Sequence, residues 1–127
     1  MNGISKLKVL VADDEQVIAN TLAMILIASN YNARAVYSGE TAVEMARTFQ
    51  PDALISDVIM PGKSGIETAL EVMAMLPSCK ILLFSGQAAT ADLLKEARAQ
   101  NHEFEVLSKP VHPKDLLARL QVTCAPA

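Results

Sequence analysis

Short, continuous apolar runs alternate along this chain with longer segments in which apolar residues recur every three or four positions. Continuous runs are typical of strands that are buried on both faces, and the longer spacing is typical of helices that bury one face. The runs predict strands at residues 9–12, 33–37, 53–56, 81–84 and 104–107. The second and fifth runs are less uniformly apolar, so we predict that these two strands lie nearer the edges of the sheet.

A helical segment follows each predicted strand. The apolar stripes of these segments begin at Ile18, Ala42, Ile66, Leu93 and Leu116. Thr90 suits the N-cap of the fourth helix, and Pro113 suits the first position of the fifth. Strands and helices in strict alternation predict a doubly wound α/β domain, with a parallel sheet, right-handed crossovers and helices on both faces.

Composition predicts one soluble domain. The chain has 127 residues, of which 51% are hydrophobic and 20% charged, which is enough for a single core. No apolar run approaches the roughly 20 residues that a membrane span needs, and no signal-type run opens the chain. Cys79 and Cys124 lie far apart and are interpreted as two unpaired, buried thiols. We therefore expect one cytoplasmic domain over residues 1–127, with a core of about residues 6–122.

Most charged and aromatic residues point to no binding function. The net charge is −3 with no basic run, and aromatic residues make up 4% of the chain, so we expect no direct binding to nucleic acid and none to membranes. Glu40 and Glu44, with Arg47, are interpreted as a solvated helix face. His102 and His112 match no metal-binding spacing and are interpreted as a surface residue and a helix-start residue.

Polar residues occur where four of the predicted strands end. Because the carboxyl ends of parallel strands lie at one edge of a sheet, and clefts of doubly wound sheets form there, we expect these residues to converge in one pocket. The four groups are Asp13-Asp14-Glu15, Asp57, Ser85-Gly86 and Ser108-Lys109-Pro110.

Such a pocket suits metal-assisted phosphoryl transfer. Close carboxylates repel one another unless a cation joins them, and oxygen ligands without His or Cys suit Mg²⁺, with Mn²⁺ as an alternative. Asp57 could then accept a phosphoryl group as the nucleophile. Ser85 would hydrogen-bond that group, and Lys109 would offset its charge. Gly86 leaves room for its approach, and Gly62 supplies the permissive backbone for a turn after Asp57.

At these residues the chain resembles the receiver domain of bacterial two-component response regulators, especially the single-domain chemotaxis-regulator type. The resemblance covers residues 6 to about 122. It implies a flavodoxin-like fold with five parallel strands in the order 2-1-3-4-5, an arrangement for which chemotaxis regulators are a standard example. The motifs that carry it, in this order, are Asp13-Asp14, Asp57 followed by Met60-Pro61-Gly62, Ser85-Gly86 and Lys109-Pro110.

The resemblance also implies a metal-binding set. Asp14 and Asp57, together with the backbone carbonyl of Ile59, would bind Mg²⁺ directly, whereas Asp13 would bind it through water. No residue is assigned to an organic cofactor.

By the same resemblance, Asp57 is the phosphoacceptor, Ser85 is the switch hydroxyl, and Lys109 contacts the phosphoryl group from a cis Lys109–Pro110 bond. The donor would be a phosphohistidine on a sensor histidine kinase or a histidine phosphotransfer protein. The output would be a partner protein that binds the face formed by residues 90–120. The chain is therefore expected to be a switch that assists its own phosphorylation and dephosphorylation, and not a conventional enzyme.

Two positions depart from the family. Val106 stands three residues before Lys109, where Tyr or Phe is usual, and Phe104 has the wrong offset to replace it. Ile59 stands two residues after Asp57, where the family often has a polar or longer side chain. We expect the apolar Ile59 to alter the rate at which water removes the phosphoryl group.

Other interpretations remain open at this point. The acids at 13–15 could be first-turn residues of a helix, favoured by its dipole. The whole chain could be a phosphorylation-independent scaffold with the same fold, which Val106 favours. A small Mg²⁺ phosphatase would usually carry a second acid at the position of Ile59. A flavin-binding protein would need a phosphate-cradling loop in place of Asp13-Asp14-Glu15.

Overall fold

The computed structural model describes residues 6–86, 104–108 and 112–124, which form a sheet with helices on both of its faces. Every strand pairing is parallel, and the order is β2-β1-β3-β4-β5. The doubly wound fold and its strand order are therefore confirmed, as is the edge position of β2 and β5. The strands are β1 Lys8–Ala12, β2 Asn32–Val36, β3 Ala53–Asp57, β4 Lys80–Ser85 and β5 Glu105–Ser108.

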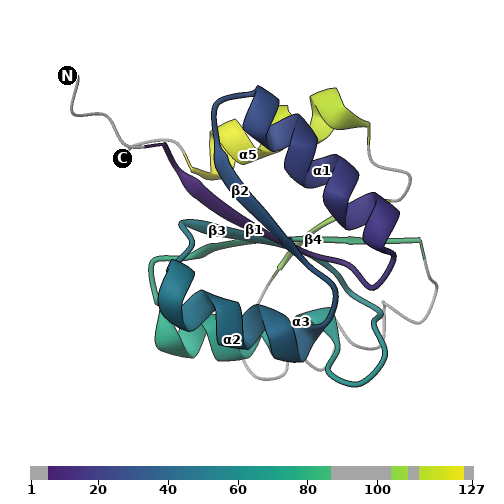
Figure 1. The fold of residues 1–127 in the computed structure, drawn as a ribbon, viewed down its shortest axis with the longest axis vertical. Helices are drawn as coiled ribbons and strands as arrows, with labels where there is room; N and C mark the ends of the chain where they lie inside the picture. Colours follow the sequence, from purple (N-terminus) through teal and green to yellow (C-terminus); the bar gives the residue numbers. More distant parts are fainter. Residues whose placement is uncertain (1–5, 87–103, 109–111, 125–127) are drawn as a thin grey trace.

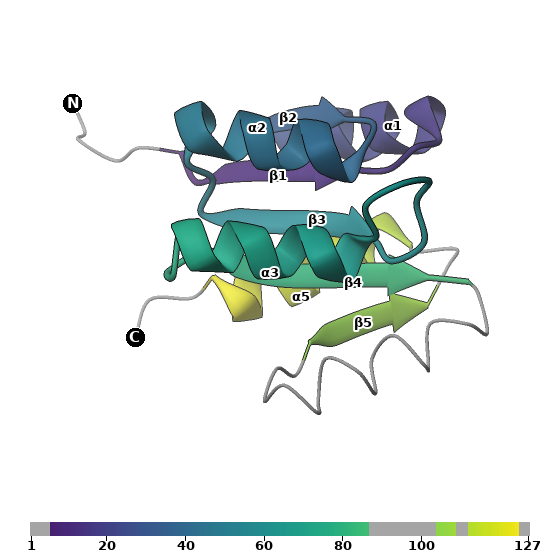
Figure 2. The same cartoon turned by 90° about the horizontal axis from the view of Figure 1, so that it is seen from below.

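Two helices cover each face of the sheet within the described residues (Figure 1, Figure 2). Helices α1 and α5 lie on one face, and α2 and α3 lie on the other. The predicted helix that begins near Thr90 and Leu93 lies outside the described residues. The helices are α1 Gln16–Ala28, α2 Gly39–Phe49, α3 Gly65–Met75 and α5 Pro113–Thr123.

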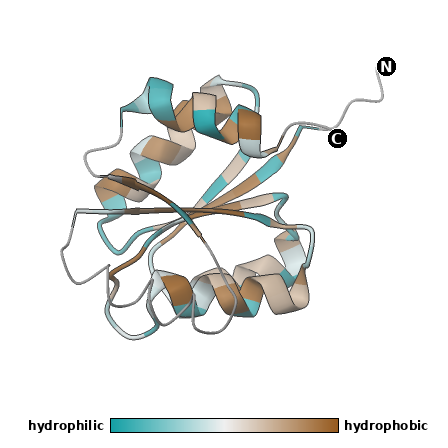
Figure 3. Ribbon diagram, turned by 180° about the vertical axis from the view of Figure 1, so that it is seen from behind, coloured by the Kyte–Doolittle hydropathy of each residue, from teal (hydrophilic) through white to brown (hydrophobic). Residues whose placement is uncertain are grey.

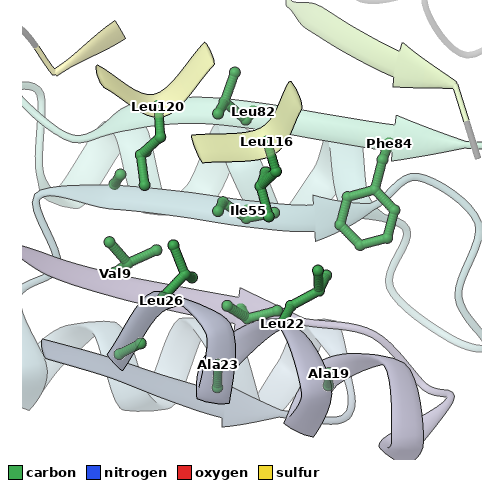
Figure 4. Packing of buried hydrophobic residues seen from close by; sticks show 13 residues of the cluster. Val9, Ala19, Leu22, Ala23, Leu26, Ile55, Leu82, Phe84, Leu116 and Leu120 are labelled. Carbon is green, nitrogen blue, oxygen red and sulfur yellow. The ribbon is translucent and has the colours of Figure 1, made fainter. Parts of the chain in front are cut away.

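The central strands are apolar on both sides because each side packs against a pair of helices. In β1, Val9 belongs to the core under α1 and α5, whereas the next residue, Leu10, belongs to the core under α2 and α3. Figure 4 shows Leu22 of α1 and Leu116 of α5 converging on the first of these cores. All five residues of β3 are buried, and the middle of the sheet is the most continuously hydrophobic part of the fold (Figure 3). This two-sided burial is the physical reason for the continuous apolar runs.

Side-chain caps set where the helices begin. The Ser38 hydroxyl accepts a hydrogen bond from the Thr41 backbone N–H at the start of α2. Helix α5 has Pro113 at its first position, and the Nδ1 atom of His112 accepts from the Lys114 N–H at 3.1 Å. The interpretation of His112 as a helix-start residue is therefore confirmed.

Three strands end one residue later than their apolar runs. The predictions ended β3 at residue 56, β4 at residue 84 and β5 at residue 107, but Asp57, Ser85 and Ser108 are the last residues of these strands. Asp57 stays in register with Phe84, and Ser85 with Ser108. The reason is that backbone groups form the ladder, so pairing continues after the side chains become polar.

Within the described ranges, none of the helices combines the length and the apolar character that a membrane crossing requires. Cys79 and Cys124 are both free thiols, as predicted. Cys79 is buried, but Cys124 is only half-buried, because it follows the last residue of α5.

Candidate metal and phosphoryl site

Three aspartates meet where β1 and β3 end. Ala12 of β1 is in register with Ser56 of β3, so the residues that follow them, Asp13 and Asp57, emerge side by side. Carboxylate oxygens of Asp13, Asp14 and Asp57 all lie within 4.8 Å of one another. The convergence that the sequence predicted for these three residues is what the structure shows.

The three carboxylates differ in exposure. Asp13 is fully buried, Asp57 is 6% exposed, and Asp14 is exposed. Removing carboxylates from water costs free energy unless other groups compensate their charge. A group of oxygen ligands with two buried members fits a hard divalent cation.

Backbone hydrogen bonds fix the turn from β1 into α1. The Asp13 N–H donates to the Val36 carbonyl at 3.2 Å, and Asp13 Oδ1 accepts from the Glu15 N–H at 2.9 Å. Glu15 is the N-cap residue of α1, yet its side chain makes no capping hydrogen bond. The first turn of α1 also contains no acidic residue, so the alternative in which the acids at 13–15 are first-turn residues of a helix is not supported.

A pocket of about 520 Å³ opens over this cluster. Its walls come from three neighbouring strands: the acids after β1, the end of β3 with the segment that follows it, and the residue after β4. The lining residues are Asp14, Glu15, Asp57, Ile59, Met60, Pro61 and Gly86.

The loop that follows β3, residues 58–64, forms one wall of this pocket, and backbone contacts hold its two ends together. The Gly65 N–H donates to the Val58 carbonyl at 2.8 Å, and the Val58 N–H donates to the Phe84 carbonyl at 3.1 Å. Gly62 has a φ of 74°, a left-handed conformation that favours glycine. The turn that the sequence predicted after Asp57 is therefore present at Gly62.

Sequence reasoning missed Gly65. An ideal Cβ at this position would lie only 2.0 Å from the Asp57 carbonyl oxygen, so the first residue of α3 presses against the backbone of the proposed phosphoacceptor. The Ser56 hydroxyl donates to the same carbonyl oxygen at 2.9 Å. The sequence signal for this contact was the glycine directly after the N-cap residue Ser64. Glycine disfavours a helix, so its presence there indicates a position without room for a side chain.

The structure describes some of the other predicted residues but not all of them. Ser85 is buried at the end of β4, and Gly86 lines the pocket. Lys109 and Pro110 lie outside the described residues. Val106 packs with Phe104 against the cluster formed by Val58, Ile66 and Leu83, and Ile59 packs there too.

Comparisons with known proteins identify response regulators and their receiver domains as similar to this chain. A sequence model of the response regulator receiver domain matches residues 9–121. The chain is 28% identical over 113 residues to the probable transcriptional regulatory protein TcrX of Mycobacterium tuberculosis, an alignment that covers 89% of this chain and 47% of that protein. The chain thus spans about half the length of this curated relative.

Solved structures agree. The chemotaxis protein CheY4 of Vibrio cholerae superposes with a TM-score of 0.82 at 27% identity, covering 94% of this chain and 99% of that one. A putative response regulator from Chloroflexus aurantiacus superposes with a TM-score of 0.81 at 28% identity, covering 96% of this chain and 100% of that one. A CheY-like receiver domain protein from Methanospirillum hungatei superposes with a TM-score of 0.84 at 19% identity, covering 94% of each chain. This third similarity concerns the fold alone.

Proposed function

This chain belongs to the response regulator receiver domain family, and from that premise we propose that it is a phosphoacceptor in which Asp57 carries a transient acyl-phosphate. Receiver domains are signalling modules of two-component systems, and the phosphoryl group would act here as a switch for partner binding. We also propose that residues 1–127 form a single receiver domain. The observation that carries the proposal is the cluster of Asp13, Asp14 and Asp57, whose carboxylate oxygens lie within 4.8 Å of one another.

The donor atoms present fit Mg²⁺. Asp14, Asp57 and the backbone carbonyl of Ile59 would hold the ion, and Asp13 would hold it through water. When bound, Mg²⁺ would supply positive charge beside the phosphoryl oxygens. Asp57 and Ile59 both line the pocket, as does Asp14, so the proposed ligands share one solvent-accessible space.

Asp57 would act as the nucleophile. One carboxylate oxygen forms a bond to phosphorus while the bond between phosphorus and the nitrogen of a donor phosphohistidine breaks, and the donor imidazole leaves and takes up a proton. Asp57 suits this role because β3 and Gly65 fix its backbone, while its side chain borders the pocket. Precise positioning of the reacting oxygen is the main contribution a protein makes to this reaction.

Ser85 and Lys109 would bind the transferred group. The Ser85 hydroxyl would donate a hydrogen bond to a phosphoryl oxygen, and the Lys109 ammonium would offset its charge. The assignment of Lys109 and of its neighbour Pro110 rests on the sequence motif. Gly86 would leave room for the group, and Gly62 would support the loop beneath it.

The donor would be a sensor histidine kinase or a histidine phosphotransfer protein. Helix α1 supports a protein donor, because it starts directly after the acidic residues and contains no charged side chain. Its outer surface exposes Val17, Met24 and Ile27, which are 78%, 68% and 52% exposed. Val17 lies at the end of α1 that follows the acidic residues, and Met24 and Ile27 lie towards its other end, so exposed apolar side chains occur along the helix and suit contact with a partner helix. The output partner would bind the face formed by residues 90–120.

Mapping the modified residue tests the proposal. After incubation with acetyl phosphate and Mg²⁺, borohydride reduction converts an aspartyl-phosphate into homoserine, which peptide mass spectrometry can locate. We expect homoserine at position 57. Asp52 is the matched control, because it lies at the other end of the same strand, where it accepts a hydrogen bond from the Lys8 N–H at 2.8 Å. Modification at Asp52, or none at Asp57, would contradict the proposal.

A further inference from the structure

The loop of residues 58–64 forms a hydrogen bond to helix α2, none of whose residues lines the pocket. The Lys63 backbone N–H donates to Oε2 of Glu40 at 3.1 Å, and Glu40 lies in the first turn of α2. Three residues of this loop, Ile59, Met60 and Pro61, line the pocket. The interpretation of Glu40 as part of a solvated face is therefore incomplete: its side chain is exposed, but its carboxylate binds the loop.

The start of α2 packs closely against the loop at two places, Gly62 and Lys63. An ideal Cβ at Gly62 would lie 2.8 Å from Glu40 Oε2, and one at Gly39 would lie 2.9 Å from the Lys63 carbonyl oxygen. The carboxylate therefore occupies the space that the missing side chain of Gly62 leaves. Any other residue at position 62 would meet this carboxylate as well as an unfavourable φ.

Charge strengthens the same contact. Hydrogen bonds from the backbone N–H groups of Glu40 itself and of Lys63 lower the pKa of the Glu40 carboxyl, so the acceptor stays ionised. Hydrogen bonds to an ionised acceptor are stronger than those between neutral groups. The Lys63 ammonium also forms an ion pair with Glu71 of α3, which raises the pKa of Lys63. Lys63 is thus bonded to α2 through its backbone and to α3 through its side chain.

We propose that Glu40 is a positioning residue for the metal site: its carboxylate fixes the loop of residues 58–64, and so holds the Ile59 backbone beside Asp57. This inference rests on the proposed function, because it concerns the same Mg²⁺ site. Glu40 does not reach the ion or the phosphoryl group. It acts through its hydrogen bond to Lys63, which lies two residues after Pro61, the last residue of the loop that lines the pocket.

Mg²⁺ titration calorimetry on four proteins tests this role. Glu40→Ala removes the acceptor, and we expect its Mg²⁺ affinity to fall by roughly 2- to 10-fold, which corresponds to the net value of one hydrogen bond. Glu40→Gln keeps an acceptor oxygen but loses the charge, so its affinity should fall less than that of Glu40→Ala. Glu44→Ala removes an exposed acid one turn further along α2 and should leave the affinity unchanged.

Hydrogen exchange of the Lys63 amide in the metal-free proteins gives a second readout. The amide should exchange faster in Glu40→Ala than in the wild type, and at an intermediate rate in Glu40→Gln. Unchanged Mg²⁺ affinity in Glu40→Ala would overturn the role of Glu40, as would equal losses in the alanine and glutamine variants, which would indicate a charge effect. Failure of the wild type itself to bind Mg²⁺ would instead contradict the proposed function, and the role of Glu40 would fall with it.

Discussion

Single residues decide the geometry of the site through close contacts with the backbone around Asp57 and Gly62. Gly65 has no room for a side chain because the Asp57 carbonyl oxygen lies against it. Glu40 occupies the space beside Gly62. Both contacts join residues that are distant along the chain or belong to different elements, and both hold the backbone next to Asp57.

Replacing Gly65 by alanine tests the first of these contacts. A glycine-to-alanine change in a helix normally stabilises a protein by about 0.4–1 kcal/mol. Here the added Cβ would lie 2.0 Å from the Asp57 oxygen, and relieving such overpacking costs about 1–3 kcal/mol. We therefore expect Gly65→Ala to lower the free energy of unfolding measured in urea. An increase would show that α3 can move away from β3 at no cost.

The Cys79 thiol, at the opposite edge of the sheet, should make the free energy of unfolding depend on pH. Burial, followed by the nearby charge of Asp52, raises the pKa of the Cys79 thiol from 9.0 to about 12. Between these values the unfolded chain loses the thiol proton while the folded protein keeps it. Stability from this group is therefore fully present below pH 9 and is lost as the pH rises towards 12.

Urea unfolding at pH 8, 9 and 10, values that bracket the ordinary thiol pKa of 9.0, can isolate this effect. Wild type should lose up to about 1.4 kcal/mol per pH unit more than Cys79→Ala above pH 9. Cys79→Ala also leaves a small cavity, but that cost does not change with pH. Parallel pH profiles for the two proteins would show that the thiol does not titrate differently on folding.

Helices and strands carry the site because their ends are well defined. At the start of α3, the Ser64 hydroxyl accepts from the Glu67 N–H at 3.1 Å, and the Glu67 carboxylate accepts from the Ser64 N–H at 3.0 Å. This capping box fixes where the loop of residues 58–64 ends. The Thr68 hydroxyl adds a bond to the Ser64 carbonyl at 2.8 Å. The helix start therefore serves as a second anchor for the loop, in addition to Glu40.

Removing the cap should weaken the whole domain modestly. Ser64→Ala loses one capping bond and is expected to lower the free energy of unfolding by about 1 kcal/mol. Ser64→Thr retains a hydroxyl and should lose less. Ser78→Ala, at an exposed serine in a turn, is the control and should change stability by less than about 0.5 kcal/mol. Equal effects of the two alanine variants in urea unfolding would contradict a capping role for Ser64.

Element ends were the least predictable feature of the fold. Burial on both faces made β1 and β3 readable as apolar runs, but Asp57 and Ser85 extend their strands through backbone pairing that side-chain type does not reveal. The helix start at a proline was easier to predict, as Pro113 shows. The bond from Lys63 to Glu40 was not predictable, because it joins residues 23 positions apart through the path of an irregular loop.

At the scale of the whole molecule, the parallel sheet explains why the site could be predicted at all. Strands that all run in one direction place their carboxyl ends at one edge, so Asp13 and Asp57 meet there although 44 positions separate them. The fold was predicted from this pattern, and the family from the resemblance carried by the motifs at the strand ends. The structure shows the fold, and the match over residues 9–121 shows the family. The roles of the individual site residues remain proposals, and Lys109 lies outside the described residues.

The central claim is that Asp57 accepts one phosphoryl group only when Mg²⁺ is bound. Intact-mass spectrometry, after incubation with acetyl phosphate over a range of free Mg²⁺ concentrations, measures this directly in the wild type and in Asp57→Asn. We predict a single phosphate adduct that increases with Mg²⁺, disappears in excess chelator and is absent from Asp57→Asn. No adduct at any Mg²⁺ concentration, or an equal adduct in chelator or in Asp57→Asn, would contradict the account.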